Sequence, residues 1–138
     1  MTKPVVCVVA GALFDRDRRV LIAQRPAGKH MAGRWEFPGG KVGPSETEVD
    51  ALVRELGEEL GVAVDVGACR AFMRLSHEYE DRVVELSLWV VGGFSGEVSG
   101  VEGQALRWLA LSRLGDEDIL EADLPFVLGL QGAEEDRK

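Results

Sequence analysis

A single amphipathic helix constrains the fold of this 138-residue chain more than any other feature. Ser45 followed by Glu48 is a capping-box pattern, which predicts the first turn of a helix. Gly61 predicts its end, because glycine readily takes the left-handed conformation that closes helices. Between them, apolar residues recur every three or four positions, at Val49, Leu52, Val53, Leu56 and Leu60. Such a helix must bury its apolar face, so it needs a sheet or another helix as a partner.

The rest of the chain supplies strands for that partner. Apolar runs bounded by turn residues predict six strands, at 5–14, 20–24, 35–37, 69–75, 83–91 and 105–109. A polar turn joins the first two strands, which predicts a hairpin. Residues 124–130 predict a closing helix, and 134–138 a frayed polar tail. This order favours an α+β fold, an α/β/α sandwich with a mixed central sheet and helices on its faces.

Length and composition are typical of one globular domain, so residues 1–138 are expected to form a single domain. The apolar start at 5–13 is too short to cross a membrane, and it lacks the charged, apolar and small-residue order of a signal peptide. We therefore expect a cytoplasmic protein without a membrane partner. Cys7 and Cys69 lie in apolar runs and are expected to be buried free thiols.

The net charge of −8 restricts the partners of the protein. A surface of this sign repels DNA and anionic membranes, so no nucleic-acid polymer is expected as a partner. An acidic protein can still bind a small anion, but only where local cations attract it. Those cations are a few arginine and lysine side chains, bound metal, or both.

The helix also carries three glutamates on one side. Because a helix turns about 100° per residue, Glu55, Glu58 and Glu59 fall within one narrow arc, beside the apolar stripe rather than opposite it. One interpretation is an acidic face turned to solvent. The other is a partly buried cluster, which needs a counter-charge. Arg54 is one source of that charge, and Mg²⁺ or Mn²⁺ is another, since hard cations prefer carboxylate oxygens.

The stretch from Gly40 to Val62 reads GKVGPSETEVDALVRELGEELGV. It resembles the Nudix box at every defined position, namely Gly40, Glu46, Arg54, Glu55, Leu56, Glu58, Glu59, Gly61 and Val62. The resemblance implies the Nudix fold and a hydrolase that cuts a phosphoanhydride bond with Mg²⁺ or Mn²⁺ as its cofactor. It also implies a set of metal ligands, made of the Gly39 carbonyl and the carboxylates of Glu55, Glu58 and Glu59.

Cleavage of a pyrophosphate needs an activated water and positive charge against the phosphate oxygens, and metal ions supply both. A carboxylate near the metal is then the general base. Glu55 is the first candidate for that role. In related enzymes the base can lie on a loop outside the helix, and Glu102 occupies such a loop, where it can also bind metal. Arg54 is expected to hold the Glu55 carboxylate by a two-pronged bond.

Segments outside the box resemble the MutT branch of the family. They are residues 23–26, 30–41, 81–82, 102–108 and 122–125. That branch removes oxidised guanine nucleotides such as 8-oxo-dGTP and releases pyrophosphate and the monophosphate. By position, the resemblance implies that Arg25 touches phosphate and that three residues lie near the base, namely Phe37, Arg82 and Asp123.

Asp123 departs from the MutT pattern, which has Asn at this position. An ionised Asp only accepts hydrogen bonds, so it suits the two adjacent donors on the edge of guanine. CTP and dCTP pyrophosphohydrolases of the superfamily nevertheless show a segment similar to Ala-Asp-Leu-Pro at 122–125. We therefore expect a diphosphatase of 8-oxo-dGTP, with CTP or dCTP as the alternative substrate. Asp123 can also act as the N-cap of the last helix.

A function of another class is a Nudix-fold domain that binds nucleotides without cutting them. Such domains usually lack glutamates of the box, and all of them are present here. An enzyme acting on a nucleoside triphosphate is therefore favoured. The sequence leaves open whether the protein is a monomer or a homodimer, and how many metal ions it binds.

Overall fold

The computed structural model of the chain describes residues 2–136. Its largest sheet has four strands in the order β4-β1-β7-β6. These are β1 (Val5–Leu13), β4 (Gly39–Lys41), β6 (Cys69–Glu78) and β7 (Val83–Val91). β1 runs parallel to β7 and antiparallel to β4, and β6 and β7 form an antiparallel pair. The sheet is therefore mixed, as the sequence predicts.

Shorter strands form a second sheet and a small ribbon. The second sheet has the order β3-β2-β9, with β3 (Trp35–Glu36), β2 (Arg19–Gln24) and β9 (Leu106–Ala110) all antiparallel. The ribbon pairs β5 (Ala63–Val64) with β8 (Phe94–Ser95). The ribbon lies in segments where the sequence pattern predicts no strand, because two-residue strands are too short to show a periodicity.

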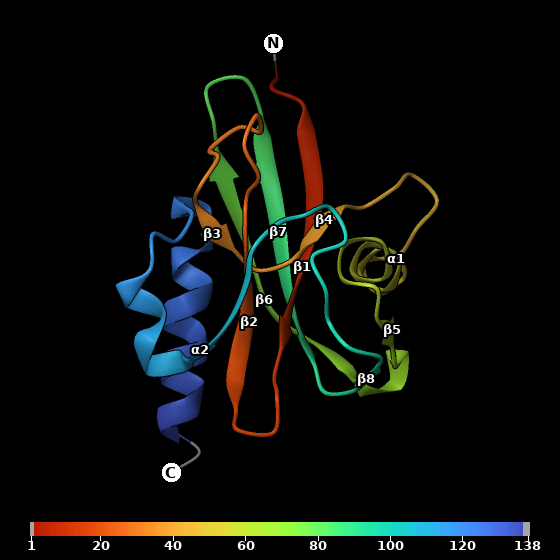
Figure 1. Cartoon of the computed structure of the whole chain (residues 1–138). Coiled ribbons are helices and arrows are strands. Elements are labelled where there is room, and N and C mark those ends of the chain that lie inside the picture. The colour runs from red at the N-terminus through yellow and green to blue at the C-terminus, as the bar shows by residue number, and fades with distance from the viewer. Residues whose placement is uncertain (1, 137–138) are drawn as a thin grey trace.

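Two α-helices flank the strands. They are α1 (Glu48–Leu60) and α2 (Leu124–Asp136), and three short 3-10 helices lie at Val66–Ala68, Leu111–Asp116 and Glu121–Asp123. Figure 1 shows α1, seen end-on, on one side of the strands and α2 on the other. The expected α+β sandwich, with a mixed sheet between helices, is confirmed.

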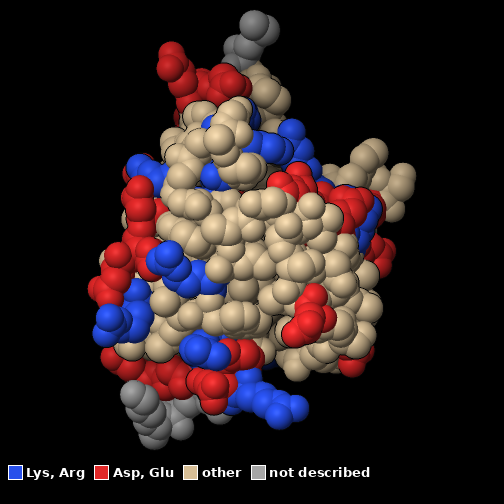
Figure 2. Space-filling model, viewed as in Figure 1, with Lys and Arg blue, Asp and Glu red and all other residues tan. Residues whose placement is uncertain are grey.

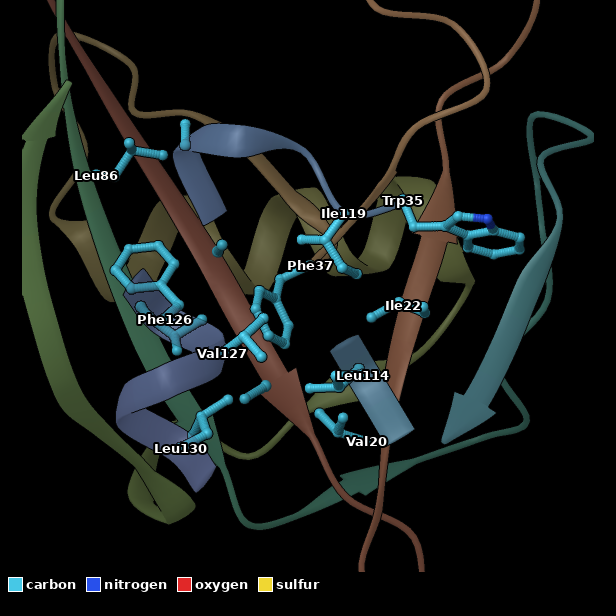
Figure 3. Close-up of a cluster of buried hydrophobic side chains, with 14 of the residues drawn as sticks. Val20, Ile22, Trp35, Phe37, Leu86, Leu114, Ile119, Phe126, Val127 and Leu130 are labelled. Carbon is cyan, nitrogen blue, oxygen red and sulfur yellow. The ribbon is translucent and has the colours of Figure 1, made fainter. Parts of the chain in front are cut away.

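The central strand β1 contributes to an apolar core on each of its faces. Val9 and Leu13 belong to the core beneath α1, whereas Ala10 and Ala12 belong to the core beneath α2. Figure 3 shows the second core, where side chains of α2 such as Phe126 lie close to residues of the sheets. The alternation along one strand therefore holds both helices against the same sheet.

The leucines of the predicted apolar stripe of α1 are buried as expected, and its valines, Val49 and Val53, are half-buried. Leu52, Leu56 and Leu60 have no exposed surface. Burial of one leucine side chain contributes about 1.5–3 kcal/mol, so this stripe is a main source of stability on that face. Gly61 ends the helix in the left-handed conformation with a φ of 72°, as predicted.

The helix begins two residues later than its capping pattern suggests. Thr47, not Ser45, is the N-cap, and its side chain accepts a hydrogen bond of 3.2 Å from the Asp50 amide. The preceding residue explains the difference. The carboxylate of Glu46 accepts a hydrogen bond of 2.8 Å from the Gly43 amide, which closes a separate turn before the helix starts.

The predicted hairpin between the first two strands is wrong. β1 and β2 share a single isolated bridge, between Phe14 and Val20, and then separate into different sheets. Each strand has better partners far along the chain, since β1 pairs over its whole length with β7 and β2 pairs with β9. Pairing between distant segments therefore overrides the local turn signal.

Two smaller expectations also need correction. Residues 134–136 belong to α2 rather than to a frayed tail, and Glu134 accepts a bond of 3.1 Å from Arg18; the last two residues lie outside the described part. Cys7 and Cys69 are free thiols as predicted, but Cys7 is exposed and Cys69 is partly exposed. Within residues 2–136, no helix has the length and apolar character needed to cross a bilayer.

We predict that Gly39→Ala destabilises the protein strongly. A Cβ atom at this position lies 2.0 Å from the Val9 carbonyl oxygen and 2.7 Å from the Ala10 Cα, so the backbone of β4 must move away from β1. Such overpacking costs about 1–3 kcal/mol or more. Gly115→Ala is the matched control, because its Cβ meets open space. Urea unfolding should show a clear loss for Gly39→Ala alone; equal midpoints for the two variants contradict this account.

Candidate active site

A pocket of about 480 Å³ opens where the turn between β3 and β4 meets the four-stranded sheet. This volume lies within the usual range for small-molecule sites. The pocket brings together seven of the residues singled out from the sequence, namely Arg25, Phe37, Gly39, Glu59, Arg82, Glu102 and Asp123. Arg54, Glu55 and Glu58 do not line it. Of these three, Glu55 is one contact away, since its carboxyl group lies against the pocket residue Gly40.

The pocket collects positive charge in a protein whose net charge is −8. Its lining includes four cationic side chains, those of Arg25, Lys29, Lys41 and Arg82, beside four acidic ones, those of Glu36, Glu59, Glu102 and Asp123. Figure 2 shows that basic and acidic side chains lie side by side around the rim of one face, while the middle of that face carries few charges. An anionic ligand can therefore find local cations despite the overall charge, as the sequence argument requires.

Arg54 lies at the centre of an ion-pair network on α1. Its guanidinium forms a two-pronged bond with Glu46, at 2.7 and 2.8 Å, and single bonds with Glu55 at 2.9 Å and Glu58 at 3.3 Å. It also donates to the Lys41 carbonyl at 3.1 Å. The expected two-pronged bond therefore exists, but its acceptor is Glu46 rather than Glu55. The bond from Arg54, with help from the Gly43 amide, lowers the pKa of Glu46 to about 2.

Gly40 allows the Glu55 carboxylate to lie against the backbone of β4. A Cβ atom at position 40 would come within 2.3–2.6 Å of the three carboxyl atoms of Glu55. The side chain of Glu55 is 16% exposed, whereas that of Glu58 is 61% exposed. The glycine and the arginine thus fix Glu55 from two sides, while Glu58 remains largely in solvent.

Glu59 is a carboxylate without a cationic partner in the described chain. Its Oε2 accepts a hydrogen bond of 3.3 Å from the Gly39 amide. Burial raises the pKa of Glu59 to about 8, and the negative charges of Glu55, Glu36 and Glu102 add to this rise. The charged form is therefore unfavourable unless a cation binds nearby.

The donor set around Glu59 suits a hard cation. It offers carboxylate oxygens on α1 and on the Glu102 loop, next to a tight glycine turn, and Mg²⁺ prefers such oxygen ligands. Among residues 2–136, no three acidic, histidine or cysteine side chains already form a compact metal cage. Arg54 explains part of this, because it holds Glu55 and Glu58 by its own bonds.

The loop that carries Glu102 is tied to the end of α1. The side-chain amide of Gln104 donates to the Glu59 carbonyl at 3.1 Å, and its oxygen accepts from the Glu102 amide at 3.0 Å. The Val101 amide also donates to the Glu59 carbonyl. These bonds keep Glu102 near Glu59, which is why its charge contributes to the raised pKa of Glu59.

Asp123 is the most deeply buried acid of the pocket, with 4% of its surface exposed. Its Oδ2 accepts a hydrogen bond of 3.0 Å from the Phe37 amide. Burial raises the pKa of Asp123 to about 7, and the charge of Glu36 acts in the same direction, while the Phe37 amide and Arg25 oppose it. Although Asp123 directly precedes α2, this bond crosses to another segment instead of capping the helix.

Glu36 is a pocket residue that sequence reasoning missed. It accepts a bond of 2.9 Å from Arg25, and burial raises its pKa although Arg25 offsets part of the rise. In the sequence it lies between Trp35 and Phe37, where a glutamate looks like an ordinary outward residue of a strand. The antiparallel pairing of β2 with β3 brings Glu36 close to Arg25, which follows β2, and a local sequence pattern does not reveal that pairing.

The remaining predicted residues differ in what they present to the pocket. Arg82 lies at the rim, with its guanidinium 5.2 Å from the centre of the Tyr79 ring. The ring of Phe37 packs edge-on against Phe126 in the core and is 3% exposed. Phe37 therefore affects the pocket mainly through its amide, which orients Asp123.

Comparison with known proteins identifies the family. The family described as the NUDIX domain matches residues 9–128. The chain belongs to the Nudix family. A CTP pyrophosphohydrolase of Escherichia coli is 42% identical to this Nudix protein over 121 residues, which are 86% of the chain and 87% of the relative. An 8-oxo-dGTP diphosphatase of the same organism is 36% identical over 124 residues, which cover 90% and 95% of the two proteins.

A solved structure supports the same assignment. The solution structure of the E. coli ORF135 protein superposes on this Nudix protein with a TM-score of 0.86 and 35% identity, covering 98% of this chain and 94% of the other. The Nudix fold and the MutT-like branch implied by the sequence are thus confirmed. The chain is a Nudix hydrolase, and its box extends from β4 through the loop before α1 to the end of that helix.

We predict that Glu59→Gln stabilises the metal-free protein at alkaline pH. The pKa of Glu59 is about 8 in the fold, against an ordinary value of about 4.5 for a glutamate. Folding therefore favours the protonated form, and its stabilising effect is complete below about pH 4.5 and lost as the pH rises through about 8. Gln stays neutral at every pH. At alkaline pH the free energy of unfolding of the variant should therefore exceed that of wild type by at least ~1 kcal/mol, or a few degrees in Tm.

The measurement is the Tm of wild type and variant in a chelating buffer at acidic and alkaline pH. Glu58→Gln is the matched control, because this exposed acid should change stability by no more than about 0.5 kcal/mol at either pH. A Glu59→Gln variant whose Tm advantage does not grow with pH would disprove the burial argument for this carboxylate.

Proposed function

We propose that this Nudix hydrolase is a Mg²⁺-dependent nucleoside triphosphate pyrophosphohydrolase, with residues 1–138 acting as one domain. It cuts the substrate to the monophosphate and pyrophosphate. The observation that carries the proposal is the joint lining of one pocket by the buried Asp123 and by Glu59, which has no cationic partner within residues 2–136. The first attracts the metal that a triphosphate needs, and the second offers polar atoms to a base.

The acids of α1 hold the metal in this proposal. The ligands are the Gly39 carbonyl and the carboxylates of Glu55, Glu58, Glu59 and Glu102. When bound, Mg²⁺ or Mn²⁺ supplies the positive charge that acidifies water and neutralises phosphate oxygens. Glu55 takes the proton of the attacking water as general base, with Glu102 as the alternative base on the loop.

Two arginines have different parts in the proposed reaction. Arg54 is a positioning residue, because its guanidinium bonds Glu46, Glu55 and Glu58 and does not line the pocket. Arg25 binds phosphate, since it lines the pocket and its side chain is 25% exposed.

For the base, we propose oxidised guanine, and thus 8-oxo-dGTP as substrate. An ionised Asp123 accepts from both the N1–H and the 2-amino group of such a base, with Phe37 and Arg82 nearby in the pocket. The second candidate is CTP or dCTP. It is favoured by the 42% identity to a protein named CTP pyrophosphohydrolase. An ionised Asp123 meets two donors on guanine, but a donor beside an acceptor on cytosine.

The test is release of pyrophosphate by the purified chain with Mg²⁺, from 8-oxo-dGTP, dGTP, CTP, dCTP and ADP-ribose. We expect turnover of at least one triphosphate, no turnover after chelation, and a fall of at least ~100-fold in kcat for Glu59→Gln. A protein that binds these nucleotides without releasing pyrophosphate is a nucleotide sensor, and that result excludes the proposal.

We also predict that Arg54→Ala lowers kcat by about 10- to 100-fold with little change in KM. The reason is that Arg54 orients the acids without touching the substrate. Arg74→Ala is the matched control, since Arg74 also bonds a glutamate of α1, Glu48, but lies on the exposed surface. Steady-state kinetics separates the two parameters. A large rise in KM at constant kcat would instead make Arg54 a phosphate ligand.

A further inference from the structure

The strand β6 lies at an edge of the four-stranded sheet, and its partner strand within residues 2–136 is β7. An edge strand presents unpaired amides and carbonyls, which can pair with a strand of another molecule unless proline, a bulge or charge prevents it. β6 contains no proline, and its register shift lies between Ala71 and Met73. The segment 74–78 therefore offers a regular edge, and only its charges decide what can pair with it.

The hairpin of β6 and β7 shows which backbone groups point toward this edge. The Tyr79 amide donates to the Arg82 carbonyl at 2.8 Å, so these two residues form a hydrogen-bonded pair. In an antiparallel ladder, hydrogen-bonded pairs alternate with pairs that are not bonded. The register stays regular back to Arg74. Arg74, Ser76 and Glu78 consequently direct their amides and carbonyls away from β7, toward any added strand.

Two side chains on this edge are charged, exposed and only partly engaged. Arg74 is 64% exposed and bonds Glu48 through Nε and Nη2, which leaves its Nη1 without an acceptor within residues 2–136. Glu78 is 69% exposed and accepts from Lys3 at Oε2, which leaves its Oε1 without a donor in the same part of the chain. Each side chain can therefore take one more partner of opposite charge.

A second copy of β6, antiparallel and centred on Ser76, matches these groups. Ser76 then lies opposite Ser76 of the second copy, and Arg74 lies opposite Glu78 in both directions. Side chains directly opposite each other share a face, with Cβ atoms about 4.5–5.5 Å apart, so each cross-strand ion pair is within reach. Centring the two strands on Arg74 or on Glu78 would bring like charges together instead. The charges thus select a single register.

We propose that residues 74–78 form a self-complementary interface, through which two copies of this protein join their sheets edge to edge. Arg74 of one copy then bridges its own Glu48 and Glu78 of the second copy. That Glu78 also holds its own Lys3, so positive and negative charges alternate along the whole network. A short strand pair buries little surface, so the dimer is weak and depends on salt. The inference is independent of the proposed function, because none of these residues lines the active-site pocket.

The first test is the oligomeric state of the full chain at low salt. Sedimentation should show a monomer that converts to a dimer as the protein concentration rises to about 1 mM, the range of a weak dissociation constant. The dimer should dissociate at about 1 M salt, where the Debye length is only about 3 Å. Hydrogen exchange followed by NMR should show protection of the Arg74, Ser76 and Glu78 amides in the dimer. A chain that stays monomeric at the highest concentration overturns the inference, as does a dimer whose newly protected amides lie in another strand.

The second test exchanges the charges. Glu78→Lys and Arg74→Glu each place like charges in both cross-strand pairs, so each variant alone should dimerise at least about tenfold more weakly than wild type. An equimolar mixture of the two variants should form a heterodimer, because every cross-strand pair in it is again of opposite charge. Glu80→Lys is the matched control: it makes the same charge change as Glu78→Lys at an exposed turn residue outside the paired segment, and it should dimerise like wild type.

Recovery in the mixture shows that both variants are folded and that their charges alone keep them apart. A mixture that remains monomeric overturns the inference. A Glu78→Lys variant that dimerises as well as Glu80→Lys also overturns it, since the paired charges then have no part in the association.

Discussion

The packing of α1 against β1 is the constraint on which the rest of the site depends. Leu52 and Leu56 pack on one face of the sheet, against Gly11 of β1. A Cβ atom at position 11 would lie only 3.2 Å from the Cδ1 atoms of both leucines, so glycine allows this close approach. This contact fixes the rotation of the helix. With the apolar face turned to the sheet, Glu55 and Glu59 must lie along the edge that borders β4, where the backbone of Gly39 and Gly40 leaves room for them.

The same geometry brings glutamate carboxylates close together at a site from which water is partly excluded. Such acids destabilise a fold unless each is neutralised, and the protein neutralises them unequally. Arg54 bonds Glu46, Glu55 and Glu58, whereas the buried Glu59 has no cationic partner among the described residues. A cation or a proton bound at Glu59 removes its charge, so either one stabilises the fold.

Local patterns predicted the parts of this structure that depend on local physics. The stripe of α1, its glycine end and the β7 strand at Val83–Val91 follow from periodicity alone. The hairpin failed because β1 pairs with a strand some eighty residues away, which no local pattern reveals. In the site, spacing identified the box acids, but Glu36 depends on Arg25 across two strands and the main partner of Arg54 lies in a turn before the helix.

The direction of each pKa shift distinguishes acids that hold the structure from acids that await a ligand. Glu46 is fully paired by Arg54, and its pKa is lowered to about 2, so its charge is stable in the fold. Glu36, Glu59 and Asp123 all have raised pKa values, chiefly through burial, and all three line the pocket. An ion pair lowers an acid's pKa where it outweighs burial, as at Glu46, whereas burial prevails at the pocket acids, even at Glu36, which is paired with Arg25. This contrast locates the functional surface of the molecule independently of the box motif, and it includes a residue, Glu36, that the motif does not contain.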